Sequence, residues 1–92
     1  MKATGLQGEL RVGYQRGAQL GAWSLDTGQT SPLRSHVEAE VLTRDEFWST
    51  QGLMTLDLQF GRFHWVWDAV HPVFQDGRVT LHVVGKPQMT KE

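Results

Sequence analysis

The residues of this chain that are best suited to chemistry are histidines that a β-sheet would bring together. The dipeptide Asp76-Gly77 lies between two apolar segments and favours a type I′ hairpin turn, which would place His71 directly opposite His82. Two imidazoles across a strand pair can bind zinc or copper, or act as a proton switch. Residues that could add a third ligand are Asp68, His64 and Glu38. Because no spacing requires such a ligand, we interpret the pair as two ordinary exposed imidazoles.

A second arrangement with possible chemistry is an acid–base pair between His64 and either Asp57 or Asp68, although a polar sheet face would contain the same residues. A serine nucleophile needs a strained turn or an adjacent base. The serines, none of which has such a context, include Ser24, Ser31, Ser35 and Ser49. Phosphate-loop, dinucleotide and zinc-protease motifs are absent. The chain is therefore predicted not to be an enzyme, with no catalytic residue, no metal ligand and no cofactor.

The aromatic segment "FGRFHWVW", residues 60–67, raises the possibility of nucleic-acid binding. A basic residue, a glycine and alternating aromatics resemble the RNP1 pattern, which stacks bases on an open sheet. However, that pattern belongs to a fold with two helices, and only one is predicted here. The 92 residues also carry a formal charge of −1, which argues against binding by bulk electrostatics. Nucleic acid is not the expected partner, and a small nucleic-acid-binding β-barrel is kept as an alternative.

Composition restricts the class of protein further. The hydrophobic fraction is 39% and the charged fraction 21%, as in ordinary globular domains. The absence of cysteine excludes disulfides and thiolate metal sites. No secretory signal and no apolar run long enough for a membrane helix are visible, so no membrane contact is expected and a cytoplasmic location is predicted, in a host cell or a virion.

The same aromatic segment predicts a hairpin with a defined register. Gly61-Arg62 fits a two-residue type II′ turn, in which glycine comes first. The pairs predicted by this turn are Phe60 with Phe63, Gln59 with His64, Leu58 with Trp65, and Leu56 with Trp67. The six apolar residues then share one face and form an apolar wall. We interpret this wall as core rather than as a stacking surface.

The remaining elements follow from alternation and from turn residues. Strands are predicted near residues 9–14, 19–26, 36–42, 73–75 and 78–84, and a parity switch near Gly21 predicts a β-bulge. Residues 27–35 are polar and are predicted to form a loop. A capping box from Thr43 to Glu46, followed by Gly52, predicts a short helix. The expected fold is mainly β, an antiparallel sandwich or small barrel of six to seven strands with one short α-helix, in the order β-β-β-α-β-β-β. It would be a single domain over residues 1–92, with a loose polar tail over residues 86–92.

Candidate interface residues come from the loop and from aromatic residues outside the wall. Loop residues could become ordered on a partner, and tryptophan is enriched at protein interfaces. The candidates are Trp23, Gln29, Thr30, Leu33, Arg34 and Trp48. For the two tryptophans, burial in the core is the competing interpretation.

The order of elements and the segment "GELRVGYQRGAQLGAWSLDTG" resemble the small β-sandwich proteins of tailed phages and prophages, such as tail-tube subunits. The resemblance covers most of the chain in topology and only "WSLD", residues 23–26, in sequence. It implies self-association or contact with other virion proteins, with residues 27–35 and the tail as inter-subunit arms. The chain is shorter than a typical tail-tube subunit, which leaves room for another small virion component. We therefore expect a non-enzymatic assembly protein, with a small protein inhibitor of a host enzyme as a further alternative.

Overall fold

The computed structural model describes residues 2–12, 15–28, 33–44 and 54–91, and within these ranges the chain is built of β-strands without a helix. In chain order the strands are β1 (Lys2–Gly5), β2 (Gln7–Val12), β3 (Gln15–Thr27), β4 (Arg34–Arg44), β5 (Met54–Phe60), β6 (Phe63–Val70), β7 (Pro72–Gln75), β8 (Arg78–Val84) and β9 (Gln88–Lys91).

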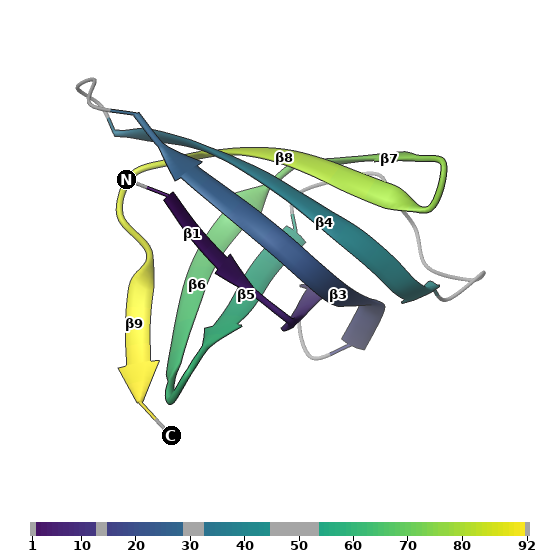
Figure 1. Ribbon diagram of the computed structural model, residues 1–92, viewed down its shortest axis with the longest axis horizontal. Helices are drawn as coiled ribbons and strands as arrows, with labels where there is room; N and C mark the ends of the chain where they lie inside the picture. Colours follow the sequence, from purple (N-terminus) through teal and green to yellow (C-terminus); the bar gives the residue numbers. More distant parts are fainter. Residues whose placement is uncertain (1, 13–14, 29–32, 45–53, 92) are drawn as a thin grey trace.

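All strand pairs are antiparallel and belong to one sheet with the order β7-β8-β4-β3-β2-β5-β6-β9, while β1 pairs with β3 beside β2. In Figure 1, β1, β3, β4 and β8 run together as a broad strip, and β5 and β6 cross this strip at an angle. Within the described residues the path of paired strands ends at β7 and β9, and β1, which pairs only with β3, has a further unpaired side. The sheet wraps around its core, and because these strands lack a second partner in the described part of the chain it keeps free edges.

The core lies between the two halves of this bent sheet. Its buried residues are Leu10, Ala18, Leu20, Trp23, Leu25, Val37, Ala39, Met54, Leu56, Leu58, Trp67, Val70, Val79, Leu81 and Val83. They come from six strands, and along β4, β5 and β8 buried residues alternate with more exposed ones. This alternation confirms the mainly β prediction, since successive side chains of a strand point to opposite faces.

Both predicted hairpin turns are confirmed. Gly61 has a φ of 61° while Arg62 is not in the positive-φ region, as a type II′ turn requires. Asp76 and Gly77 have φ values of 52° and 75°, the pattern of a type I′ turn. The four predicted pairs of the β5–β6 hairpin are all present in the ladder.

The predicted bulge near Gly21 is also confirmed. Two residues of β3 lie between Leu20 and Trp23, whereas only one residue of β4 lies between their partners Val41 and Ala39. The parity change keeps both Leu20 and Trp23 on the buried face, where they are 1% and 2% exposed. It thereby carries Trp23 into the core.

Several details of the predicted fold were wrong. Thr43 and Arg44, the expected helix start, continue β4, because Thr43 pairs with Gln19 of β3; the rest of the predicted helix lies outside the described residues. The described part of the chain contains nine strands rather than six or seven. The two that were not predicted are β1 and β9, which extend the sheet by pairing with β3 and β6. β9 also shows that most of the tail is bound to the sheet.

Candidate functional site

Three aromatic side chains meet where β3 faces the β5–β6 hairpin. The rings of Phe60 and Trp65 are stacked, with centroids 5.1 Å apart and an interplanar angle of 17°. Trp23 lies against both of them, at 6.3 Å from Phe60 and 6.2 Å from Trp65, in tilted arrangements. These spacings are the favourable ones for aromatic pairs, which contribute about 0.5–1.5 kcal/mol beyond area burial. We call Trp23, Phe60 and Trp65 the aromatic cluster.

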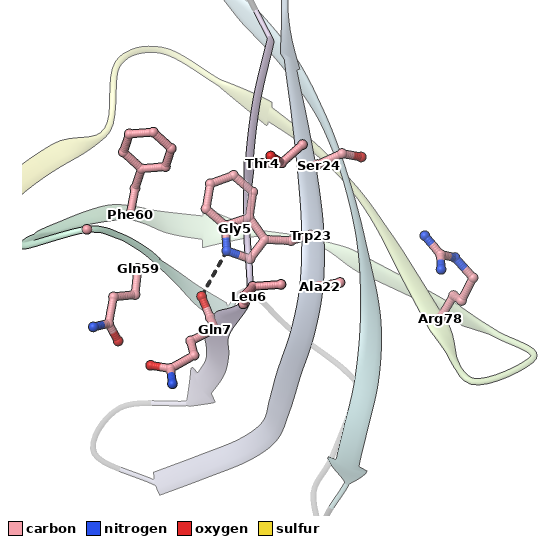
Figure 2. A pocket seen from close by; sticks show the side chains of 11 residues that line it. Thr4, Gly5, Leu6, Gln7, Ala22, Trp23, Ser24, Gln59, Phe60 and Arg78 are labelled. Carbon is pink, nitrogen blue, oxygen red and sulfur yellow. Dashed lines mark hydrogen bonds between the residues drawn. The ribbon is translucent and has the colours of Figure 1, made fainter.

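The position of Trp23 is set by β1 and β2. Its indole Nε1 donates a hydrogen bond of 2.8 Å to the backbone carbonyl of Gln7, which Figure 2 shows as a dashed line. Gly5 pairs with Trp23 across the strands, and a Cβ on Gly5 would lie only 2.4 Å from indole carbon atoms. The indole therefore occupies the space of the missing side chain. Trp23 is thus buried in the core, as the competing interpretation expected, while its part in an interface stays a prediction.

An open concavity of about 770 Å³ lies beside the aromatic cluster, where β1 meets β2. Figure 2 shows Trp23 at its centre and Phe60 on one side. Besides these two, the lining residues are Thr4, Gly5, Leu6, Gln7, Ala22, Ser24, Gln59, Gly61 and Arg78. Leu6 is 78% exposed. The lining contains one positively charged side chain and no acid, so the concavity offers mainly apolar and amide contacts.

The apolar wall of the β5–β6 hairpin is covered at its base and open at its tip. At the base, Leu56 and Trp67 are 0% and 4% exposed; at the tip, Phe60 and Phe63 are 42% and 41% exposed, although they share the same face. Met89 of β9 pairs with Trp65, which places it on this face, and it is exposed as well. We call Phe60, Phe63 and Met89 the open end of the sheet.

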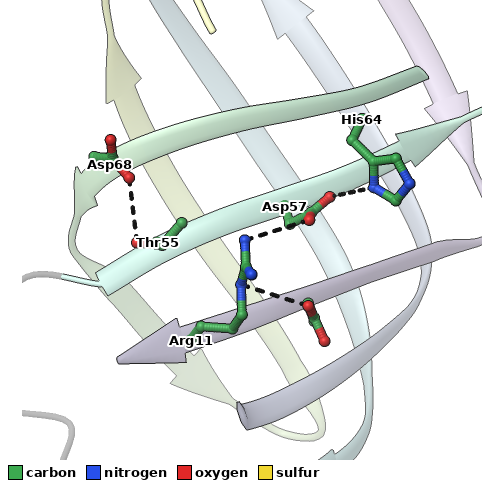
Figure 3. A network of polar contacts seen from close by, with 6 residues as sticks. Arg11, Thr55, Asp57, His64 and Asp68 are labelled. Carbon is green, nitrogen blue, oxygen red and sulfur yellow. Dashed lines mark hydrogen bonds and ion pairs between the residues drawn. The ribbon is translucent and has the colours of Figure 1, made fainter. Parts of the chain in front are cut away.

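A polar network lies on the opposite face of the same strands (Figure 3). Asp57 of β5 contacts His64 of β6 through Oδ1, 2.9 Å from Nδ1, and Arg11 of β2 through Oδ2, at 3.4 Å. Arg11 also lies 3.4 Å from Glu9. The predicted pairing of His64 with Asp57 is thus present, whereas Asp68 accepts a hydrogen bond from Thr55. Because both oxygens of Asp57 are engaged, the network joins three strands, as expected of a polar sheet face.

The predicted pairing of His71 with His82 was wrong. β7 begins at Pro72, which lacks an amide donor, and the ladder with β8 stops there, so His71 falls between two strands. His82 instead pairs with His36 on the other side of β8, and their ring centroids are 4.8 Å apart. Sequence spacing could not reveal this pair, because β4 and β8 are far apart in the chain.

Two of the other interface candidates lie near the C-terminal end of the predicted loop, and three lie in regions that the structure does not describe. Arg34 is exposed and begins β4, so the strand starts two residues earlier than predicted. Leu33 is half-buried, and its carbonyl accepts a hydrogen bond of 2.7 Å from Gly85. Gln29, Thr30 and Trp48 lie outside the described residues.

Comparisons with protein-family models, with curated proteins and with solved structures found no match for this chain. Among the described residues, no three histidine or acidic side chains are arranged to hold a metal ion. The described part of the chain also contains no helix that could cross a membrane. The features that bear on function are therefore the geometry of the sheet and its open end.

Proposed function

We propose that this chain is a non-enzymatic assembly protein that binds a second copy of itself through the open end of the sheet. The observation that supports the proposal is a set of apolar side chains that point toward the inner face and yet remain exposed. Phe60 and Phe63 are about two-fifths exposed, and Met89 is 61% exposed. Fully burying side chains of this size contributes on the order of 2 kcal/mol each, which gives a partner a substantial gain.

A β-strand is the partner that fits this end best. β9 pairs with β6 on one side, and within the described residues no strand pairs with its other side. An unpaired edge presents free backbone donors and acceptors, which an added strand can satisfy while its side chains cover the apolar face. A single copy of the chain thus leaves the backbone donors and acceptors on the outer side of β9 without strand partners among the described residues.

A second copy provides such a strand with compatible side chains. If two β9 strands pair antiparallel around a twofold axis at Met89, each Met89 faces its own copy and the apolar faces of both sheets become continuous. Lys91 is the only charged residue of β9 and would lie opposite Pro87, so no like charges face each other. Because β9 has only four residues, we expect modest affinity and assembly that depends on concentration.

This self-association accords with the resemblance to small virion proteins of tailed phages and prophages, whose subunits associate through sheet edges. We propose that the chain is a phage or prophage component that is made in the cytoplasm of a host cell. The concavity beside Trp23 and the exposed Leu6 offer a second contact surface for neighbouring subunits.

The proposal is tested by the molar mass in solution, measured by size-exclusion chromatography with light scattering over about a hundredfold range of concentration. We expect the mass of the wild-type chain to rise with concentration. Met89→Lys should shift the chain to the monomer. The matched control is Val84→Lys, because Val84 is equally exposed, at 63%, but lies on β8. A wild-type chain that stays monomeric throughout, or equal effects of both variants, would refute this interface.

Single-stranded nucleic acid is the second candidate partner, because positive charge accompanies the exposed rings. Arg62 lies in the turn between Phe60 and Phe63, and Lys91 pairs with Phe63. Bases could stack on these rings while the cations contact phosphates. This function predicts quenching of tryptophan fluorescence by oligonucleotides, lost in Phe63→Ala and weakened steeply by salt. An unchanged fluorescence signal would exclude it.

A further inference from the structure

A second feature, independent of the open end, is a pair of histidines on β4 and β8. His36 and His82 are direct partners in the antiparallel ladder, so their side chains leave the sheet on the same face. Their ring centroids are 4.8 Å apart, with an interplanar angle of 56°. Both side chains reach solvent, and they line an open concavity of about 490 Å³. The two imidazoles are therefore close to each other and accessible to a small ligand.

The separation of the rings suits a shared metal ion. Two imidazole nitrogens bound to a tetrahedral divalent ion at about 2.0–2.1 Å lie roughly 3.3 Å apart. Each ring nitrogen lies only about 1 Å from its ring centre, so small rotations of the two rings can bring a nitrogen of each to this spacing. Imidazole is a preferred ligand of zinc, copper and nickel.

Carboxylates beside the two histidines add negative charge, which favours a metal cation. Glu38 stands two residues after His36 on the same face of β4, and its Oε1 is 3.1 Å from His36 Nε2. Asp26 of β3 pairs with His36 from the other side and lines the same concavity. These groups do not form a converged set of three ligands, since no such set exists among the described residues. A carboxylate next to the imidazoles would still attract a cation. Glu38 can reach a cation bound at the two imidazoles by rotating its side chain.

We propose that His36 and His82 bind one divalent transition-metal ion, of the zinc, nickel and copper class, as a two-imidazole chelate between β4 and β8. Water fills the remaining positions, and Glu38 supplies a carboxylate oxygen beside or on the ion. With only two protein nitrogens, the site has modest affinity. Because the ion would hold two neighbouring strands together, its binding also stabilises the fold by mass action.

The test uses the full chain without a histidine tag, titrated with Zn²⁺ and with Ni²⁺ by isothermal calorimetry. We expect one ion per chain. His36→Asn and His82→Asn should each weaken binding at least tenfold, and Glu38→Gln by a few fold. The matched control is His71→Asn, because His71 is also exposed but lies between β6 and β7; this variant should bind like the wild type.

A spectroscopic measurement on the unaltered chain keeps the test independent of how the variants fold. Bound Cu²⁺ should show coupling to two imidazole nitrogens in its electron paramagnetic resonance spectrum. A spectrum with one imidazole nitrogen would overturn the proposal. Equal binding by the wild type and His36→Asn, or an equal loss in His71→Asn, would overturn it as well, and neither result would bear on self-association through β9.

Discussion

Replacing Gly5 with alanine tests how tightly β1 packs on the aromatic cluster. The added Cβ would lie 2.4 Å from Cε2 and Cζ2 of Trp23 and 2.6 Å from its Nε1, so the indole has to move. Gly5 lies outside the positive-φ region, and backbone strain therefore plays no part. Overpacking of this kind typically costs about 1–3 kcal/mol. If the indole loses its hydrogen bond to Gln7, the unpaired N–H adds about 1–3 kcal/mol.

The unfolded chain offsets part of this loss, because alanine has less backbone freedom than glycine, by about 0.4–1 kcal/mol. We therefore expect Gly5→Ala to lower the free energy of unfolding by about 2–3 kcal/mol. For a domain of this size that corresponds to a fall in Tm of roughly 8–24 °C. The assay is urea denaturation followed by far-ultraviolet circular dichroism, with Thr4→Ala, at an exposed neighbour on β1, as the control that should change little.

A double-mutant cycle separates the clash with Trp23 from other effects of the substitution. Phenylalanine lacks the indole nitrogen and the fused ring, so Trp23→Phe provides space beside Gly5. In that background Gly5→Ala should cost at least about 1 kcal/mol less than in the wild type. Equal costs in both backgrounds, or a cost below about 0.5 kcal/mol in the wild type, would refute the packing described for these two residues.

Three further substitutions test the core, a turn and the polar network by the same denaturation assay. Leu56→Ala removes a side chain with no exposure and should cost about 2–5 kcal/mol, whereas Leu42→Ala, at a residue 53% exposed, should cost under about 0.5 kcal/mol; similar costs would contradict the assigned core. Gly77→Ala forces alanine to a φ of 75° and should cost about 1–2 kcal/mol, and a neutral result would argue against the type I′ turn. Asp57→Asn removes the anion that Arg11 and His64 contact and should cost about 1 kcal/mol at low salt and less at high salt; a cost that does not depend on salt would contradict the ionic contact with Arg11.

The hairpins could be predicted from the sequence because the interactions that define them are local. A glycine at the first position of a two-residue turn fixes the register of the strands on either side, and Gly61 is enough to pair Leu58 with Trp65. Alternation then assigns each side chain to a face. The bulge at Gly21 could be predicted for the same reason, since one extra residue leaves a change of parity in the sequence.

Long-range pairing could not be predicted in this way. Residues 88–91 contain a single apolar residue, Met89, and give no strand signal by themselves; their pairing with β6 depends on where the chain returns after β8. Likewise, the capping-box pattern that starts at Thr43 predicts a helix locally, yet pairing with Gln19 keeps Thr43 in β4. His82 has a different neighbour from the predicted one because β4, and not the residues before Pro72, lies beside it.

The open end shows which property of a side chain can be predicted from the sequence and which property depends on the tertiary structure. Alternation along β6 determined that Phe63 and Trp67 point to the same face of the β5–β6 hairpin. Only the arrangement of the other strands decided that Trp67 is 4% exposed while Phe63 is 41% exposed. The direction of a side chain follows from its own strand, but its burial depends on whether a distant part of the chain covers it.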